Sequence, residues 1–217
     1  MKYIQRCIQL VATTIVAKEW KQLYPRLIQE YHRYEIDTEA RPPLIAQKLL
    51  ISGEDHRFFS HPGFDLIAIC RAVYRWVFLG LVEGASTIEQ QLVRVLSGRY
   101  ERTLTRKCNE ILLATLITTV IPKHVLPSIY LNVGYFGWRM NNFGQACVRL
   151  RLTPHSMSYY EAANLVARLK YPEPRMASPE RRTQIERRAH HLLNLYSLHV
   201  STSVYKCPAW RLSYASI

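Results

Sequence analysis

Residues 54–65 read EDHRFFSHPGFD and gather two adjacent carboxylates, two histidines, an arginine and several phenylalanines around a Pro-Gly turn. A solvent-exposed surface seldom needs this mixture, whereas a site that positions a polar substrate and shields a carboxylate from water does. Taken alone, Glu54 and Asp55 are more typical of a solvated helix end. The remaining sequence has to decide between an ordinary helix end and a functional site.

Length and charge indicate the number of domains and the chemical class of the partner. The chain has 217 residues, which suits one domain, or one domain with an appendage, around a substantial core. It carries 29 Lys and Arg against 16 Asp and Glu, a net charge of +13. We expect an anionic partner, such as phospholipid head groups or a phosphorylated substrate. No zinc finger or RNA-binding strand motif is present, so no nucleic-acid partner is expected.

The cysteines predict neither a disulfide framework nor a metal site. They are odd in number and widely spaced among apolar neighbours, without a pair at metal-ligand or redox spacing. We expect buried thiols, above all at the three central positions. The five are Cys7, Cys70, Cys108, Cys147 and Cys207.

The N-terminus predicts an amphipathic helix. Its apolar run over residues 7–17 is far shorter than the ~20 residues of a membrane-spanning helix, and no small-residue cleavage site follows. Ile4, Ile8, Val11 and Ile15 recur at helical spacing. Such a helix could lie on a membrane or pack on the domain itself, and the sequence leaves both open.

The chain divides at residues 41–43, Arg-Pro-Pro, because two consecutive prolines cannot lie inside a continuing helix. Residues 44–52 then predict a short buried helix that leads to Glu54, and residues 61–63 predict a turn. We expect an N-terminal helical extension (1–41) that is a candidate for membrane association, a body that carries the site (42–200) and a tail of unassigned role (201–217).

Residues 64–82 are strongly apolar, yet they carry Arg71 and Arg75 four residues apart and aromatic residues within 74–78. Basic residues on one face and aromatic residues on the other suit an element that dips into a bilayer interface. A core helix with two surface arginines is the alternative.

A second helix is expected from Ser86, with Ser86 and Glu89 as a capping box, to a stop at residues 97–98, Ser-Gly. Amides behind a glycine at a helix N-terminus form a site for phosphate or carboxylate. The start of this helix is therefore a candidate anion site.

A third helix over residues 106–121 is apolar almost all round after Glu110 and should be the central core helix. Arg106 and Glu110 lie one turn apart and predict an ion pair worth ~0.3–0.5 kcal/mol. Further helices are predicted over residues 158–170 and 180–198. Strand signals are weak and no repeat is visible, so the expected fold is mostly α.

Three of these stretches resemble the signatures of the peptidoglycan glycosyltransferases, glycosyltransferase family 51, and they follow one another along the chain in the order of the family. GASTIEQQLVRVL (84–96) resembles the pattern Gly-x-Ser-Thr-Ile-x-Gln-Gln, and RKCNE (106–110) resembles Arg-Lys-x-x-Glu. EDHRFFSHPG (54–63) resembles Glu-Asp-x-x-Phe-x-x-His-x-Gly, and it matches at Glu54, Asp55, Phe58, His61 and Gly63.

Two later stretches extend the resemblance. KHVLPSIYLNVGYFG (123–137) is similar to the fourth family signature. YEAA (160–163) with LVA (165–167) resembles the Glu-Ala-Ala-x-Leu-Ala helix that follows it. The resemblance covers about residues 42–198, which makes 42–200 the expected glycosyltransferase domain.

The resemblance implies a lysozyme-like helical domain with a membrane-facing small lobe. It implies polymerisation of lipid II at the outer, periplasmic face of the bacterial cytoplasmic membrane. A sugar 4-hydroxyl attacks the anomeric carbon of the donor with inversion, and a lipid pyrophosphate leaves. The implied partners are lipid II, the growing glycan strand and the membrane surface, with penicillin-binding transpeptidases or divisome proteins as further candidates.

The resemblance also assigns roles to residues. Glu54 is the expected general base, and Glu110 is the second catalytic carboxylate and the candidate ligand of Mg²⁺ or Mn²⁺. No organic cofactor is expected. The expected substrate-binding residues are Asp55, Ser86, Thr87, Gln90, Gln91, Arg94, Arg102, Arg106 and Lys107. The expected structural residues near the site are Phe58, His61, Gly63, Gly84 and Asn132.

Three departures from the family pattern, together with an N-terminus that does not predict the full membrane anchor of most relatives, suggest an alternative, and the expected membrane attachment is peripheral or weak. Ser128 replaces a glutamate, Pro127 is expected to interrupt a helix, and Glu89 replaces a common threonine and adds negative charge near the phosphate site. A catalytically impaired relative that binds lipid II or membrane as a scaffold or regulator would tolerate these changes. A glycan-cleaving enzyme of lysozyme-like fold is disfavoured, because that reaction needs no phosphate clamp.

Overall fold

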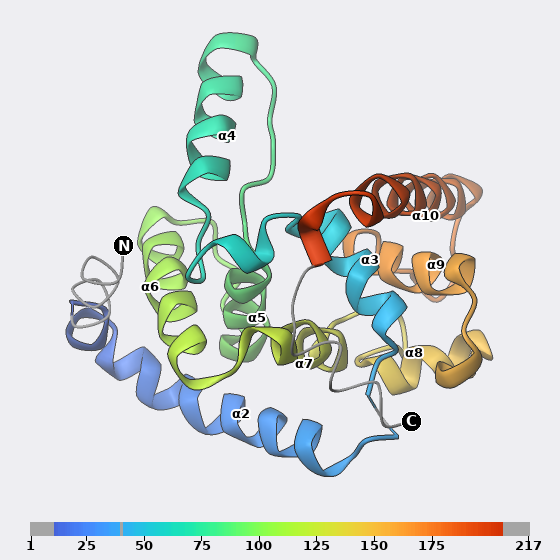
Figure 1. Cartoon of the computed structure of the whole chain (residues 1–217), viewed down its shortest axis with the longest axis horizontal. Coiled ribbons are helices and arrows are strands. Elements are labelled where there is room, and N and C mark those ends of the chain that lie inside the picture. Colours follow the sequence, from blue (N-terminus) through green and yellow to red (C-terminus); the bar gives the residue numbers. More distant parts are fainter. Residues whose placement is uncertain (1–10, 40, 206–217) are drawn as a thin grey trace. The chain divides into compact units, whose positions relative to one another are not determined.

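The computed structural model describes residues 11–39 and 41–205, and they form helices joined by loops (Figure 1). Within these residues the only β-structure is two isolated bridges, so the mostly α, lysozyme-like helical fold expected from the sequence is confirmed. The chain separates into two compact units. The first unit holds Arg57–Lys123 and the chain up to Gln29, and the second holds Glu30–His56 and the chain from His124.

The N-terminal helical segment packs through residues outside the predicted apolar stripe, so packing of Val11 and Ile15 on the domain is wrong, and the membrane alternative stays a prediction. The described residues of this segment are helical from residue 11 onward, and α2 (Ala17–Ile36) starts in the first unit and ends in the second. Val11 and Ile15 of the predicted apolar stripe are exposed, and Ile4 and Ile8 lie outside the described residues. The buried side chains are Ala12, Val16, Leu23, Leu27 and Tyr34.

Helices α5 (Ile88–Ser97) and α6 (Leu104–Val120) pack together in the first unit. Each begins at a threonine, Thr87 or Thr103, whose hydroxyl accepts a hydrogen bond from the amide three residues later. These caps satisfy amides that the helix itself leaves without partners. The predicted core helix is confirmed, because α6 buries most of its side chains from Glu110 to Ile117.

The predicted capping box of Ser86 and Glu89 is wrong, because α5 begins one residue later. Thr87 is the cap, and its Oγ1 also donates a hydrogen bond to the Gly63 carbonyl oxygen at 2.7 Å. Glu89 is instead fully buried, and its carboxylate lies 3.0 Å from Lys123 Nζ. Burial of a carboxylate is costly unless a cation lies nearby. Lys123 supplies that cation and so allows Glu89 to face the interior.

The turn at residues 61–63 presses against α6. Gly63 has a φ of +110°, and a Cβ on it would lie 2.5 Å from the Ala114 carbonyl oxygen. Only glycine tolerates both conditions. Thr118 Oγ1, one turn further along α6, donates a hydrogen bond to the Pro62 carbonyl oxygen at 3.2 Å, which also holds the turn on this helix.

Helix α4 (Leu66–Leu79) and the segment that returns from it project from α5 and α6 (Figure 1); we call residues 65–84 the α4 arm. Ala68 is the one buried residue of α4, so the alternative of a core helix is wrong. Glu83 pairs with Arg71 at 2.9 Å and Arg75 at 3.0 Å, which ties the returning segment to the helix. The exposed large apolar residues of the arm are Leu66, Ile67, Val73, Tyr74, Trp76, Val77, Phe78, Leu79, Leu81 and Val82.

The second unit is built around α3 (Leu44–Glu54). Pro43 lies at its N-cap, and Glu54 is its last residue, two residues beyond the predicted helix end at Ser52. Helix α3 buries most of its residues and packs on α9 and α10. The other helices are α7 (Leu126–Val133), α8 (Phe143–Leu150), α9 (Tyr159–Lys170) and α10 (Pro179–Val200). Short 3₁₀ turns are η1 (Phe58–Ser60), η2 (Lys123–Val125), η3 (Pro154–Ser156) and η4 (Ser203–Tyr205).

Pro127 does not interrupt a helix, so that expectation is wrong. It lies in the first turn of α7, where proline fits because the backbone N–H that it lacks would have no helical partner. Ser128 is fully buried, and its hydroxyl has no hydrogen-bond partner among the described residues.

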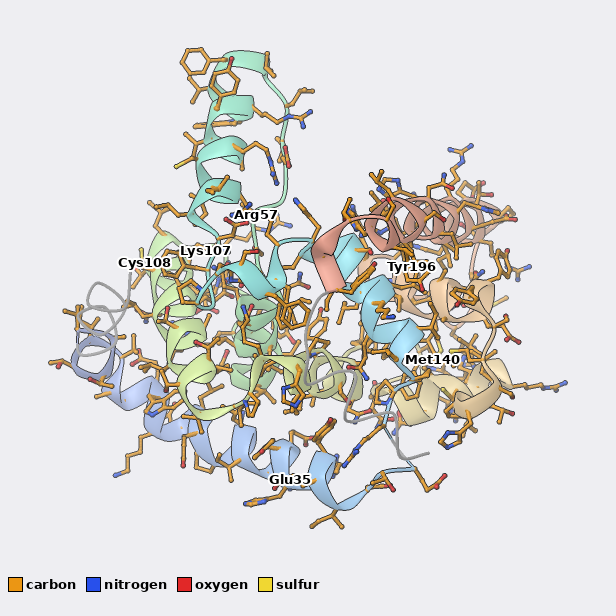
Figure 2. The ribbon with its side chains drawn as sticks, viewed as in Figure 1. Glu35, Arg57, Lys107, Cys108, Met140 and Tyr196 are labelled. Carbon is orange, nitrogen blue, oxygen red and sulfur yellow. The ribbon has the colours of Figure 1, made fainter. Side chains whose placement is uncertain are left out.

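The expectation of buried thiols holds at one described position. Cys147 is buried, and burial raises the pKa of its thiol to about 11. Cys70 on the α4 arm and Cys108 on α6 (Figure 2) are exposed, which corrects the prediction. Cys7 and Cys207 lie outside the described residues.

No single helix in the described part of the chain has the length and hydropathy needed to cross a bilayer. Among the described residues, one bent pair of helical segments, α6 with residues 123–133, reaches that length and hydropathy when the two are counted as one span.

Asp65 should control the stability of the α4 arm. Its carboxylate accepts hydrogen bonds from the amides of Ile67 and Ala68 and pairs with Arg57 Nε at 2.8 Å. We expect Asp65→Ala to weaken the arm by about 1–2 kcal/mol, while Asp65→Asn keeps most of the cap. Hydrogen exchange of the α4 amides measures the effect. Equal protection in Asp65→Ala and the wild type would contradict it.

The same carboxylate predicts a pH dependence. Burial raises the pKa of Asp65, but the Ala68 amide and the Arg57 guanidinium outweigh it and lower the pKa below its usual value. Its contribution is therefore present above the unfolded-state pKa and is lost as the pH falls through the folded-state pKa. The loss of protection in acid should be smaller in Asp65→Asn.

Candidate functional site

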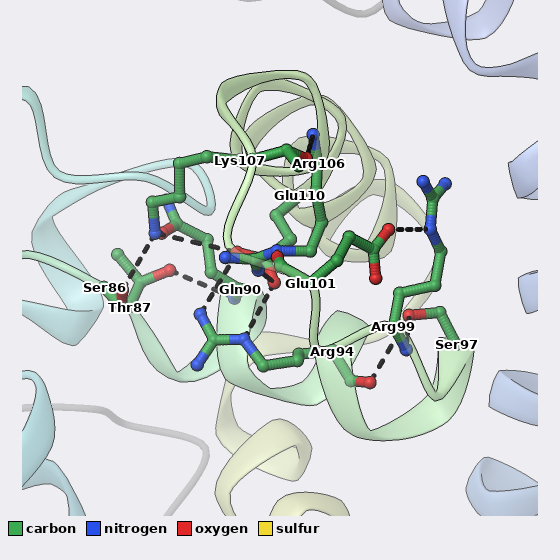
Figure 3. A network of polar contacts seen from close by, with 11 residues as sticks. Ser86, Thr87, Gln90, Arg94, Ser97, Arg99, Glu101, Arg106, Lys107 and Glu110 are labelled. Carbon is green, nitrogen blue, oxygen red and sulfur yellow. Dashed lines mark hydrogen bonds and ion pairs between the residues drawn. The ribbon is translucent and has the colours of Figure 1, made fainter.

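A buried carboxylate surrounded by cations lies between α5 and α6 of the first unit (Figure 3). Glu110 is 2 % exposed, and its oxygens accept hydrogen bonds from Arg94 of α5 at 2.8 and 3.2 Å. Arg106, one turn earlier on α6, forms the predicted ion pair with the same carboxylate. Lys107 Nζ lies 3.7 Å away. We call Arg94, Arg106, Lys107 and Glu110 the Glu110 cluster.

Lys107 links the cluster to the N-terminus of α5. Its ammonium donates hydrogen bonds to Ser86 Oγ at 2.8 Å and to Gln90 Oε1 at 2.7 Å. Gln90 is fully buried, and its Nε2 has no hydrogen-bond partner among the described residues. The structure thus brings together Ser86, Gln90 and the four cluster residues, as the sequence predicted, with Thr87 as the cap of the same helix.

The electrostatics of the cluster favour an anion. Three cationic side chains face one carboxylate, which leaves two excess positive charges between α5 and α6, and the Lys107 ammonium lies at the N-terminus of α5. Burial lowers the pKa of the Lys107 ammonium; Arg94 and Arg106 lower it further, while Glu110 opposes them. Donors and positive charge at a helix start form a binding site for phosphate oxygens.

A cavity of about 560 Å³ borders the cluster on the side of α2. Arg106 and Glu110 contribute to its wall, together with Glu19 and Arg26 of α2. Arg26 also donates a hydrogen bond to the Leu96 carbonyl oxygen at 2.7 Å, which fixes the end of α5.

Three predicted residues stand apart from the cluster contacts. Arg102 is exposed and has no hydrogen bond or ion pair with any described residue. Gln91 is half-buried on α5, and Gly84 is exposed with open space around it.

The first-signature residues of the first unit form a packed corner. Phe58 is fully buried, and His61 is buried with its Nδ1 accepting a hydrogen bond from the Gly63 amide at 3.2 Å. Lys123, which the sequence analysis missed, donates hydrogen bonds to the carbonyl oxygens of Phe58 and His61 and pairs with Glu89. The sequence feature that could have pointed to Lys123 was the unusual Glu89, because a buried glutamate requires a cation nearby.

Glu54 lies in the second unit. Arg188 of α10, 9 % exposed, donates hydrogen bonds to Glu54 Oε1 and to the Gly53 carbonyl oxygen, both at 2.8 Å. The contact of Arg188 was not predicted, because Arg188 is one of several basic residues on α10 and its neighbours in the sequence do not distinguish it. Asp55 follows as the buried C-cap of α3, and Asn132 is half-buried on α7.

The family model of the transglycosylases matches residues 21–196. The chain belongs to this family. The expected peptidoglycan glycosyltransferase domain, and with it the glycosyltransferase class, is thereby confirmed.

Several penicillin-binding proteins 1A are similar to the chain. Identity is 39 % over 118 residues with that of Escherichia coli (strain K12), covering 54 % of this chain and 14 % of the relative. It is 34 % over 119 residues with that of Rickettsia prowazekii (strain Madrid E), covering 52 % and 15 %. It is 34 % over 143 residues with that of Neisseria gonorrhoeae, covering 64 % and 18 %. The chain thus matches less than a fifth of the length of these relatives, and the roles of single residues stay predictions.

Lys107 should make anion binding sensitive to alkaline pH. Because its pKa is lowered, it should lose its proton, and the site its positive charge, at a pH below the ordinary lysine value of about 10.4. We expect affinity for inorganic pyrophosphate, measured by calorimetry, to fall there. Lys107→Arg should keep its affinity, since arginine stays charged. Lys18→Arg, at an exposed position, should behave like the wild type. A parallel fall in Lys107→Arg would contradict the role of Lys107.

Proposed function

We propose that this chain polymerises lipid II into glycan strands, with inversion at the donor anomeric carbon and a lipid pyrophosphate as leaving group. The observation that carries the proposal is the Glu110 cluster, whose two excess positive charges lie between α5 and α6, with Lys107 reaching the start of α5. A leaving pyrophosphate gains negative charge in the transition state, and fixed cations and amides stabilise that charge.

Glu54 is the proposed general base. Its carboxylate takes the proton of the acceptor 4-hydroxyl as that oxygen forms a bond to the donor anomeric carbon, and the bond from that carbon to the pyrophosphate oxygen breaks. Arg188 holds Glu54 and the Gly53 carbonyl at the end of α3, which orients the carboxylate. Arg188 acts in this scheme as a positioning residue.

The cluster residues have the complementary task. Arg94, Arg106 and Lys107 are proposed to contact the departing phosphate oxygens. Glu110 holds Arg94 and Arg106 by hydrogen bonds, so that the cations are oriented before the substrate binds. Pre-oriented charges stabilise a transition state without reorganising during the reaction.

A divalent cation at Glu110 is a further expectation from the family resemblance, and the surroundings of Glu110 do not fit it. Mg²⁺ and Mn²⁺ prefer several oxygen ligands. The polar atoms around Glu110 are instead nitrogens of Arg94, Arg106 and Lys107. No step of the proposed mechanism therefore runs through a metal. Polymerisation that stops when a chelator is added would contradict this arrangement.

Glu54→Gln should lower polymerisation of detergent-solubilised lipid II by at least about a hundredfold, since the amide cannot accept the proton. Glycan products are measured by gel electrophoresis, and circular dichroism checks the fold. Glu186→Gln makes the same chemical change at an exposed position of α10 and should leave the rate unchanged.

Two outcomes would contradict the proposal. In the first, the wild type leaves lipid II unchanged under conditions in which a known polymerase works. Retained lipid II binding without product would then favour a scaffold. In the second, Glu54→Gln polymerises as fast as the wild type, and Glu54 is not the base.

We further propose that the protein works at the outer face of the bacterial cytoplasmic membrane and that the α4 arm enters the bilayer interface. Trp76 and Phe78 are 64 % and 70 % exposed, and so large an exposed apolar surface is unusual outside interaction sites. Arg71 and Arg75 lie on the same helix and share one acidic partner, Glu83, which leaves one excess positive charge for anionic head groups.

Replacing Trp76 and Phe78 by serine should weaken binding to phosphatidylglycerol-containing vesicles by about tenfold or more. The substitution removes the apolar area that the two rings would bury in the bilayer. Co-sedimentation measures the bound fraction. Serine at Leu198 and Val200, which are exposed on α10, serves as the matched control. Equal vesicle binding by the arm variant and the control would contradict insertion of the arm.

A further inference from the structure

Three arginines surround one indole ring in the second unit. The guanidinium carbons of Arg139 and Arg149 lie 4.6 Å from the centroid of the Trp138 ring, and that of Arg175 lies 5.3 Å away. All three distances fall within the range of cation–π attraction. We call Trp138, Arg139, Arg149 and Arg175 the Trp138 cluster. No residue of the cluster belongs to the proposed catalytic machinery.

The backbone builds the cluster from separate segments. The Trp138 amide donates a hydrogen bond to the Glu173 carbonyl oxygen at 2.8 Å, and the Glu173 amide donates one to the Phe136 carbonyl oxygen at 3.0 Å. Gly137 permits this approach, because its φ is +138° and a Cβ would overlap the backbone of Glu173. Met140, labelled in Figure 2, closes the turn by an antiparallel bridge to Gly137. Arg175 is thus held next to the turn that carries Trp138.

Arg139 and Arg149 reach the ring by other routes. Arg139 has a φ of 57°, a left-handed backbone conformation that few residues other than glycine adopt. Arg149 lies in the last turn of α8, which is capped at its start by Asn142. The three cations are therefore held close together by the fold, although like charges repel one another.

No acidic side chain among the described residues pairs with the cluster. The three arginines are exposed and form no ion pair there. Glu173, the acid next to Arg175 in this segment, pairs with Arg168 at 2.7 Å. Residues 134–182 contain eight basic and three acidic residues, so their surroundings add positive charge. The fold holds three guanidinium groups together without supplying their counter-charge.

We propose that the Trp138 cluster is a docking surface for a carboxylate-rich segment of a partner protein. Guanidinium groups that stack on a ring keep their N–H edges available, and these edges match carboxylates in a bidentate geometry. Trp, Arg, Tyr and Met are enriched at protein interfaces, and the neighbouring Tyr135 and Met176 are 52 % and 89 % exposed.

A bilayer fits this surface less well. An indole that inserts into lipid has to present its face, as the exposed Trp76 can, whereas three guanidinium groups cover the half-buried Trp138. The proposal does not depend on glycosyl transfer, because it rests on residues outside that site. A binding measurement can therefore fail while lipid II polymerisation succeeds, and the reverse.

The test is binding of a fluorescein-labelled, glutamate-rich peptide to the full chain, followed by fluorescence anisotropy. Arg149→Gln with Arg175→Gln should weaken binding by about tenfold, because two charge-assisted contacts are lost. Arg182→Gln with Arg187→Gln removes the same charge from exposed positions of α10 and should change the affinity less than about twofold. Phosphatidylglycerol vesicles and duplex DNA are assayed in parallel.

The outcomes separate the possibilities. A loss confined to the cluster variant supports the docking surface. Absent peptide binding, or an equal loss in both variants, overturns it, because the effect would then be one of net charge. A cluster variant that loses vesicle or DNA binding while it keeps peptide binding also overturns it. Circular dichroism checks the fold, and since neither arginine makes a hydrogen bond to a described residue, both variants should fold.

Discussion

The buried carboxylate of Glu110 is the constraint on which the candidate site depends. Without it, Arg94, Arg106 and Lys107 would place three like charges side by side, and the helices that carry them would repel at their closest approach. Breaking a buried pair typically costs about 3–5 kcal/mol, more than an exposed helix pair contributes. One side chain thus joins α5 to α6 and keeps a net positive charge between them, so stability and the proposed anion binding rest on the same contacts.

Local patterns predicted the elements that their own residues determine. Apolar spacing predicted α3, α6 and α9, although not the capping box of Ser158 and Glu161 that starts α9. The motif order predicted which residues gather at the Glu110 cluster. Contacts between distant segments had no such signal. Arg188 lies 134 residues from Glu54, and one arginine on a basic helix looks like any other until the fold selects it.

The wrong expectations share a physical cause, which is that a sequence pattern does not reveal what a face packs against. Cys70 lies among apolar neighbours, but those neighbours belong to the exposed α4 arm. At the start of α5, Ser86 and Thr87 are both suitable N-cap residues. Thr87 is the N-cap in the structure, and its hydroxyl also donates a hydrogen bond to the Gly63 carbonyl oxygen.

The burial of Glu89 bears on whether the departures from the family pattern impair the site. A glutamate near a phosphate site would oppose the substrate if its charge faced that site. Glu89 is instead fully buried, and its charge is balanced by Lys123, which also binds the carbonyl oxygens of Phe58 and His61. The substitution therefore contributes to the packed corner beneath the first signature. Since Pro127 likewise fits the first turn of α7, two of the three departures are structural accommodations and do not damage the anion site.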